Sequence, residues 1–135
     1  MIKNLSHLSL STESLEKVKN LNINILDFKI AHNFINNKNE IYGFFIYCGN
    51  NTFIEFFKVE KLMINKQNLY RHLCFEVENI EIMKNKLEIL DQKIEIKRGR
   101  TDNILQFFVK DFENNMIEFH QNDKHSKLNK FLDLK

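Results

Sequence analysis

The sequence predicts an α+β fold in which one β-α-β-β-β module occurs twice. Two short stretches, residues 6–10 and 70–77, both place a histidine and a leucine at the start of an apolar strand pattern. Each is followed by a helical pattern, and each half then closes on a similar strand, at 52–56 and at 115–119. Self-similarity of this kind indicates that one structural unit is duplicated along the chain.

The repeated positions include ionisable residues. His7 lies 48 positions before Glu55, and His72 lies 46 positions before Glu118. The two histidines are therefore offset by 65 positions and the two glutamates by 63. Because a histidine opens each module and a glutamate closes it, these four residues are the first candidates for a functional site.

The first module begins with a predicted strand over residues 2–10. Capping residues at 11–14 then precede Leu15, Val18 and Leu21, whose spacing predicts a helix. Three apolar and aromatic runs follow, and the asparagine-rich segments between them are typical of turns. These runs predict strands over residues 28–35, 41–48 and 52–59.

The second module follows the same order. After the strand at 70–77, Asn79 is placed to cap a helix, along which an apolar stripe runs at helical spacing. The stripe consists of Ile80, Met83, Leu87 and Leu90. Three further strands are predicted over residues 93–98, 104–110 and 115–120.

The module boundaries follow from these elements. We expect a first module over residues 1–60, a linker over 61–68, a second module over 69–122 and a C-terminal tail over 123–135. In the tail, Leu128, Phe131 and Leu132 have the spacing of one short amphipathic turn, and fraying is the alternative.

Composition and charge exclude several classes of function. The 135 residues carry 20 basic and 18 acidic side chains without a basic block, so no nucleic-acid partner is expected. No run of about eighteen apolar residues occurs, so no membrane span is expected either. With no sign of an export signal, we expect a cytoplasmic protein in which Cys48 and Cys74 are reduced thiols.

The alternation of faces along a strand places the ionisable residues on mixed faces. His7 shares a face with Ser9 and Ser11, whereas Leu8 and Leu10 take the other face. The strands that carry the other histidine and the two glutamates divide in the same way. The apolar faces are expected to pack against the helices, and the mixed faces are expected to line a partly polar cavity.

Two histidines and two glutamates that converge in such a cavity offer nitrogen and oxygen donors without a thiolate. This donor set suits a divalent ion such as Ni, Zn, Co, Mn or Fe. A single strand histidine or glutamate is more often structural or solvent-facing. The recurrence of all four at matched positions favours a metal site, with coordination positions left open for water or substrate.

At these residues the sequence resembles the vicinal oxygen chelate superfamily of glyoxalases, bleomycin-resistance proteins and dioxygenases, and it is most similar to glyoxalase I (lactoylglutathione lyase). The resemblance extends from residue 5 to about residue 121. Residues 111–118 resemble the family's Asp-Pro-Asp-Gly-Asn-x-x-Glu motif, with Phe112 in place of proline and Asn114 in place of glycine. The resemblance implies paired βαβββ modules that form a cupped mixed sheet with helices on its outer face.

The resemblance also implies a reaction. By position, His7, Glu55, His72 and Glu118 would bind a divalent metal ion, with Glu118 as the main catalytic base and Glu55 as the opposing carboxylate. The implied activity is that of a metal-dependent lyase or isomerase acting on a 2-oxoaldehyde thiol adduct, or a related vicinal-oxygen substrate, through a metal-bound enediolate. Family members commonly form a homodimer, and the same is expected here.

The sequence departs from the family where glutathione is held. Glutathione-binding members carry an arginine shortly after the first histidine and an asparagine shortly after the first glutamate. Ser9, Ser11, Lys58 and Glu60 occupy these regions here. The small-molecule substrate and its thiol therefore stay open, and the candidate substrate-binding residues are Phe53, Phe57, Arg98 and Arg100.

Two other functions compete with the lyase. One is a metal-free binding module of bleomycin-resistance type, with aromatic walls drawn from Tyr42, Phe44, Phe53 and Phe57. The other is a different superfamily enzyme, such as a thiol transferase, an epimerase or a dioxygenase. Sequestering members usually lack the metal ligands, so the presence of all four favours the lyase. His120 and Cys74 are interpreted as a strand-end surface histidine and a small core residue.

Overall fold

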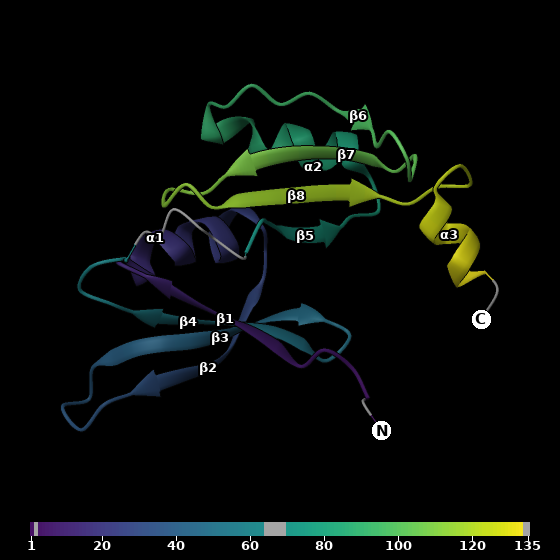
Figure 1. Ribbon diagram of the computed structural model, residues 1–135. Coiled ribbons are helices and arrows are strands. Elements are labelled where there is room, and N and C mark those ends of the chain that lie inside the picture. The colour runs from purple at the N-terminus through teal and green to yellow at the C-terminus, as the bar shows by residue number, and fades with distance from the viewer. Residues whose placement is uncertain (2, 64–69, 134–135) are drawn as a thin grey trace. The chain divides into compact units, whose positions relative to one another are not determined.

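The computed structural model describes residues 1, 3–63 and 70–133 and divides the chain into two compact units (Figure 1). Unit 1 is Met1–Lys66 and unit 2 is Gln67–Lys135. Residues 64–68 of the predicted linker lie outside the described residues. None of the described helices is long and apolar enough to cross a membrane.

Unit 1 is a βαβββ module. Its elements are β1 (His7–Thr12), α1 (Leu15–Lys19) with a π-helical continuation (Asn20–Ile25), β2 (Lys29–Ile35), β3 (Ile41–Gly49) and β4 (Thr52–Lys58). The sheet order is β1-β4-β3-β2, in which β1 pairs parallel with β4 and the other pairs are antiparallel.

Unit 2 repeats this topology. Its elements are β5 (Leu73–Glu76), α2 (Ile80–Lys86) with a 3₁₀ turn (Leu87–Leu90), β6 (Lys97–Arg98), β7 (Leu105–Lys110), β8 (Met116–Gln121) and α3 (Lys127–Leu132). The sheet order is β5-β8-β7-β6, again with one parallel pair, β5 and β8. The α+β class and the paired βαβββ modules are confirmed.

One predicted strand is much shorter than expected. The strand predicted over residues 93–98 pairs only at Lys97 and Arg98. Upstream of it, the side-chain amide of Gln92 occupies the place of a pairing strand. It donates to the carbonyl of Lys110 at 2.7 Å and accepts from the backbone N–H of Lys110 at 2.8 Å. The end of β7 is therefore satisfied without a long edge strand.

Asparagine and serine side chains provide the local signals that start helices and close turns. Ser14 caps α1 by accepting from the backbone N–H of Lys17, and Asn79 caps α2 by accepting from that of Ile82. Asn114 has a φ of 70° in the turn before β8, where the family motif has glycine. The chain thus uses asparagine for the left-handed backbone that its few glycines do not supply.

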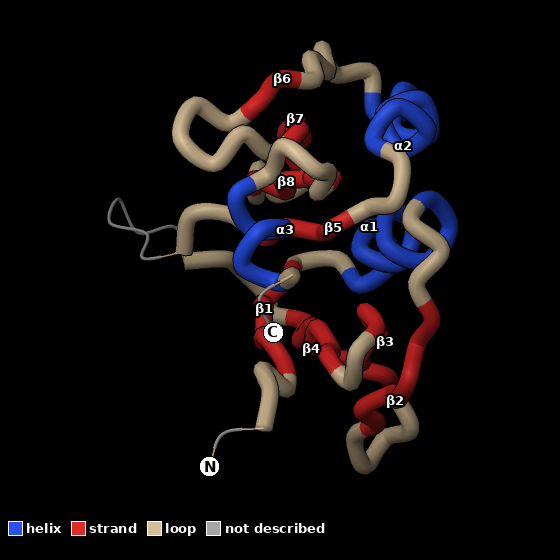
Figure 2. Tube along the Cα trace, turned by 90° about the vertical axis from the view of Figure 1, so that its right-hand side faces the viewer, coloured by secondary structure: helices blue, strands red, loops and turns tan. Residues whose placement is uncertain are grey.

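Each unit packs one face of its sheet against its own helix. Figure 2 shows α2 beside the strands of unit 2, and α1 likewise contacts β4 in unit 1. The buried apolar residues of these faces include Val18, Phe44, Ile46, Ile54, Phe56, Ile80, Leu87, Phe107, Val109, Ile117 and Phe119. Phe44 has no exposed surface, so its assignment to an aromatic cavity wall is wrong. It points to the helix face because it pairs with Phe56 across the strands.

Gly43 leaves room for aromatic rings on the opposite face of the unit 1 sheet. A Cβ atom at this position would lie 2.5 Å from the Phe56 carbonyl oxygen and 2.6 Å from the Phe57 ring. We therefore expect Gly43→Ala to lower the free energy of unfolding by about 1–3 kcal/mol, because the strand or the ring must shift. Urea denaturation measures the change. An unchanged midpoint and slope would contradict this prediction.

Candidate metal centre

In unit 2, His72 and Glu118 form a close pair. His72 lies directly before β5, and Glu118 lies in the middle of the neighbouring parallel strand β8. The His72 Nε2 atom is 2.8 Å from the Glu118 Oε2 atom. The Glu118 side chain is only 10% exposed, whereas that of His72 is 37% exposed. A buried carboxylate requires such a partner, because burial without one is costly.

In unit 1, His7 and Glu55 repeat this arrangement more loosely. The His7 Nε2 atom is 3.9 Å from the Glu55 Oε1 atom. The strand register is the same in both units: Glu55 is paired with Ser9, two residues after His7, and Glu118 is paired with Cys74, two residues after His72. Each unit therefore brings together its predicted histidine and glutamate.

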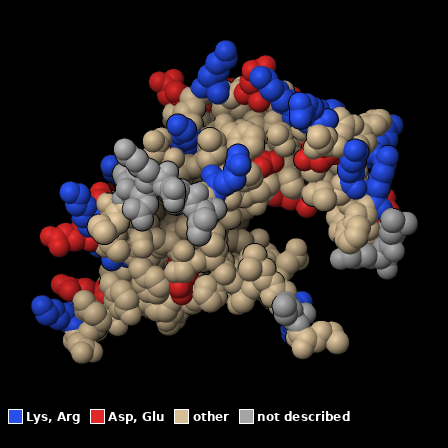
Figure 3. Space-filling view, in the orientation of Figure 1, with Lys and Arg blue, Asp and Glu red and all other residues tan. Residues whose placement is uncertain are grey.

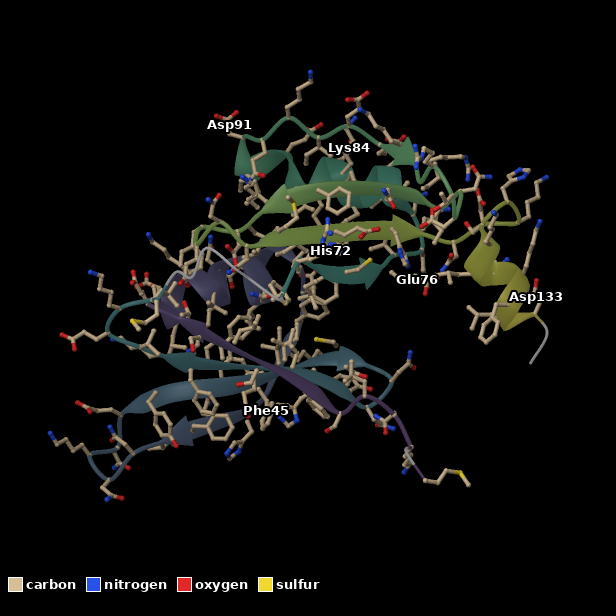
Figure 4. The ribbon with its side chains drawn as sticks, viewed as in Figure 1. Phe45, His72, Glu76, Lys84, Asp91 and Asp133 are labelled. Carbon is tan, nitrogen blue, oxygen red and sulfur yellow. The ribbon has the colours of Figure 1, made fainter. Side chains whose placement is uncertain are left out.

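An aromatic ring contacts each of these histidines by its edge. The ring centroids of His7 and Phe45 are 5.5 Å apart, and those of His72 and Phe108 are 5.6 Å apart, both with nearly perpendicular planes. Figure 4 labels Phe45 in unit 1 and His72 beside β5 and β8 in unit 2. Phe45 is paired with Glu55 across the strands, and Phe108 is paired with Glu118.

These two phenylalanines adjoin the candidate site and were not predicted from the sequence. A signal for them exists in the repeat: Phe108 and Phe45 are 63 positions apart (108 − 45), as are Glu118 and Glu55 (118 − 55). Their matched contacts indicate that the surroundings of each histidine were duplicated together with the histidine.

In unit 2, the other oxygen of the Glu118 carboxylate is turned toward a second group. The Glu118 Oε1 atom is 3.8 Å from the Nδ1 atom of His120, and the same nitrogen is 3.3 Å from the sulfur of Cys74. Burial raises the pKa of the Cys74 thiol to about 12, and the negative charge of Glu118 adds to this shift. The side chain of His120 is 16% exposed, so its interpretation as a surface histidine is wrong.

The two candidate arginines have different surroundings. Arg98 donates to both carboxylate oxygens of Asp123, with a shortest N–O distance of 2.7 Å, and to the carbonyl of Asn103. This guanidinium holds the pKa of the Asp123 carboxyl well below its usual value. Arg100 is exposed. Lys and Arg side chains lie among Asp and Glu on the face shown in Figure 3.

The candidate residues Phe53 and Phe57 belong to a connected aromatic array on the sheet of unit 1. Phe53 contacts Phe45 and Tyr47, with ring centroids 5.8 and 5.4 Å apart. Phe57 stacks on Tyr42 at 5.9 Å and contacts a further ring, Phe34, at 4.9 Å. The array lies on the face that also carries Glu55, opposite the helix.

Solved structures with similar folds were found. A glyoxalase family protein from Enterococcus faecalis has a TM-score of 0.73 at 22% identity, over 87% of this chain and 97% of that chain. A mutant of the fosfomycin resistance protein FosX from Listeria monocytogenes, complexed with Mn(II) and 1S,2S-dihydroxypropylphosphonic acid, has a TM-score of 0.72 at 17% identity, over 97% and 99%. The protein has the glyoxalase fold. Lactoylglutathione lyase from Agrobacterium tumefaciens also matches, with a TM-score of 0.65 at 13% identity, over 90% and 95%.

The glyoxalase fold confirms, at the level of the fold, the resemblance to vicinal oxygen chelate proteins. No protein-family model and no curated protein matches the sequence. At these identities the fold is shared while the reaction is not determined, because one fold supports several chemistries.

The donors that this glyoxalase fold presents fit a divalent ion. When metal bonds are about 2.0–2.2 Å long, ligand atoms at adjacent coordination positions lie roughly 3 Å apart. The His72–Glu118 separation of 2.8 Å is close to this value, and the His7–Glu55 pair at 3.9 Å is somewhat wider. Imidazole nitrogen together with carboxylate oxygen is a donor set for Zn, Ni, Co, Fe or Mn.

Proposed function

We propose that the protein is a metal-dependent enzyme that acts on a small substrate with two neighbouring oxygen atoms. The observation that supports this most is the duplicated His–Glu pair, with matching strand register and a matching aromatic edge contact in each unit. A duplicated core alone would not require an imidazole beside a carboxylate at both places.

The proposed ligands are His7, Glu55, His72 and Glu118. A divalent ion held by these residues would act as a Lewis acid and stabilise negative charge that develops on the two substrate oxygens. His7 and His72 serve only to bind. Glu118 is the proposed base for the proton on the carbon between the oxygens, and Glu55 is the opposing carboxylate that returns or accepts it.

The specific reaction we propose is of glyoxalase I type, with a 2-oxoaldehyde thiol adduct as substrate. Its support is the resemblance of the four ligand positions and of the segment before Glu118. The thiol is left open, because the residues that hold glutathione are replaced. The FosX match, a complex with Mn(II) and a vicinal diol, supports the broader class of vicinal-oxygen substrates. The proposal includes a cytoplasmic homodimer, on the resemblance alone.

The metal content of the purified protein tests the proposal. We expect about one divalent ion per chain in protein prepared without chelator, or after addition of Ni, Co, Zn or Mn followed by desalting. His72→Ala and His7→Ala should each lower the manganese content, because each removes one of four ligands for an ion that does not favour a thiolate. His125→Ala is the matched control, since His125 is an exposed histidine of the C-terminal segment.

Parent protein that stays free of metal under all these conditions would contradict the proposal. Equal manganese content in the parent and in His72→Ala would contradict the ligand assignment. Metal-loaded parent is then assayed with methylglyoxal and several thiols, and formation of a 2-hydroxyacyl thioester is the expected product.

The aromatic array of unit 1 supports a second candidate function, the metal-free sequestration of a flat ligand. Contiguous rings lie beside the carboxylate of Glu55, and they belong to Phe34, Phe45, Phe53, Phe57 and Tyr42. Such a surface suits a planar cation, because aromatic faces and a carboxylate both attract positive charge. Absence of metal together with saturable binding of a planar cation would favour this function over the enzyme.

A further inference from the structure

The carboxylate of Glu118 faces two different sets of donors within unit 2. Its Oε2 atom is paired with His72, while its Oε1 atom lies on the side of His120. One potential ligand atom from each of Cys74, Glu118 and His120 lies within 4.8 Å of the others. These three groups come from two neighbouring strands and need no residue of unit 1.

The strand register explains why these side chains meet. Cys74 and Glu118 are directly paired between the parallel strands β5 and β8, and His120 is two residues after Glu118 on the same face. Glu76, which is paired with His120, accepts from the side-chain amide of Asn122 at 2.8 Å and is engaged there.

The cluster is not a product of the module duplication. The positions of unit 1 that match Cys74 and His120 are Ser9, two residues after His7, and Phe57, two residues after Glu55. Neither residue is a metal ligand of this kind. Unit 2 therefore carries a thiol and an imidazole beside its glutamate, in addition to the donors that the two units share.

We propose that Cys74, Glu118 and His120 form a thiolate-containing metal site that is complete within unit 2 and takes a borderline-soft divalent ion such as Zn²⁺ or Co²⁺. With Zn–S of about 2.3 Å and Zn–N of about 2.0–2.1 Å, tetrahedral ligands lie roughly 3.5 Å apart. The S–N distance of 3.3 Å between Cys74 and His120 and the N–O distance of 3.8 Å between His120 and Glu118 bracket this value. His72 or water completes the coordination.

The charges of the site are suited to a dication. Binding displaces the thiol proton of Cys74 to solvent, which leaves a thiolate beside the Glu118 carboxylate. These two negative charges balance the two positive charges of the ion. Sulfur also selects for softer ions, because thiolate binds Zn²⁺ in preference to Mn²⁺.

This site does not depend on the proposed enzyme function, although it shares Glu118 with it. An ion held through Cys74 and His120 engages the carboxylate that the four-ligand site requires. Occupancy of the two sites is therefore mutually exclusive, and Zn²⁺ is expected to compete with Mn²⁺ for the protein.

Cobalt spectroscopy tests the proposal without an activity assay. Co²⁺ is titrated anaerobically, with a non-thiol reductant, into the full chain, and a near-ultraviolet thiolate-to-cobalt charge-transfer band is expected. Cys74→Ser should abolish the band, and Cys48→Ser, the matched control at the other cysteine, should retain it. His120→Ala should weaken binding by at least roughly 10–100-fold, the loss typical of removing even an outer partner of a metal. His7→Ala should leave the band intact, because unit 1 contributes no ligand.

Three results would overturn the proposal: no band in the parent, a band that persists in Cys74→Ser, or a band lost in His7→Ala. The circular dichroism of each variant, compared with that of the parent, separates loss of a ligand from loss of the fold. Failure of this proposal is distinguishable from failure of the proposed enzyme. If cobalt binds but no charge-transfer band appears, the thiolate site is contradicted, whereas the four-ligand site is not. Conversely, a band that is independent of His7 in protein without turnover supports the thiolate site alone.

Discussion

Glu118→Gln is expected to lower kcat for a 2-oxoaldehyde thiol adduct by roughly 10²–10⁴-fold, the usual contribution of a positioned general base. The amide preserves the size of the side chain but cannot take a proton at neutral pH. It is also a weaker metal ligand than a carboxylate. Steady-state kinetics on metal-loaded protein measures the effect, with metal content determined on the same samples so that loss of the base and loss of the ion are separated.

The control for this substitution is Glu81→Gln, which makes the same chemical change at an exposed position in the first turn of α2. It should alter kcat by less than about twofold, since an exposed surface substitution away from the proposed ligands usually changes stability by no more than about 0.5 kcal/mol. Glu55→Gln gives a second comparison: as the opposing carboxylate, it should also lower turnover. Metal-loaded Glu118→Gln that retains the kcat of the parent would contradict the assignment of Glu118 as the base.

Most of the fold could be predicted because the same order of strand and helix patterns occurs in both halves of the sequence. Both helices were predicted from a polar cap followed by apolar residues at helical spacing, and the apolar stripe of the second helix, with Asn79 as its cap, is the clearer of the two. The strand ending at Arg98 was predicted too long, because alternation along residues 93–98 cannot reveal that the side chain of Gln92 bonds the edge of β7 instead. Pairing partners are a tertiary property, which the period of a single strand does not contain.

The candidate site was predictable to the level of residue type and face. Alternation placed His72 and Glu118 on one kind of face, and the parallel register of β5 and β8 brings them to 2.8 Å. Phe44 was assigned to the wrong face, because both faces of β3 carry aromatic residues and its pattern has no polar side. The approach of Cys74 to His120 depends on side-chain conformation across two strands. From the sequence alone, Cys74 was interpreted as a small core residue and His120 as a surface histidine at a strand end.

Phe107 and Phe108 allow the fold and the site to be tested separately with one chemical change. They are adjacent in β7 and point to opposite faces: Phe107 is 1% exposed, and Phe108 is 39% exposed. Phe107 stacks on Phe119 with centroids 5.3 Å apart, in the core beneath α2, whereas Phe108 contacts the edge of His72. Phe107→Ala should lower the free energy of unfolding by about 3–5 kcal/mol, because it removes a buried ring and leaves a cavity.

Phe108→Ala should cost less than about 1 kcal/mol in the same urea titration, since a part-exposed ring loses little burial and leaves no closed cavity. Its effect should appear in metal binding instead, because His72 loses the ring that contacts its edge, and the Kd for the ion should rise. Equal destabilisation by both substitutions would mean that the open face of unit 2 is as tightly packed as its core. We therefore expect Phe107 to contribute mainly to stability and Phe108 mainly to metal binding. This contrast follows from the two-residue period of the strand, because one face of the sheet packs against the helix and only the other can bear the side chains of a site.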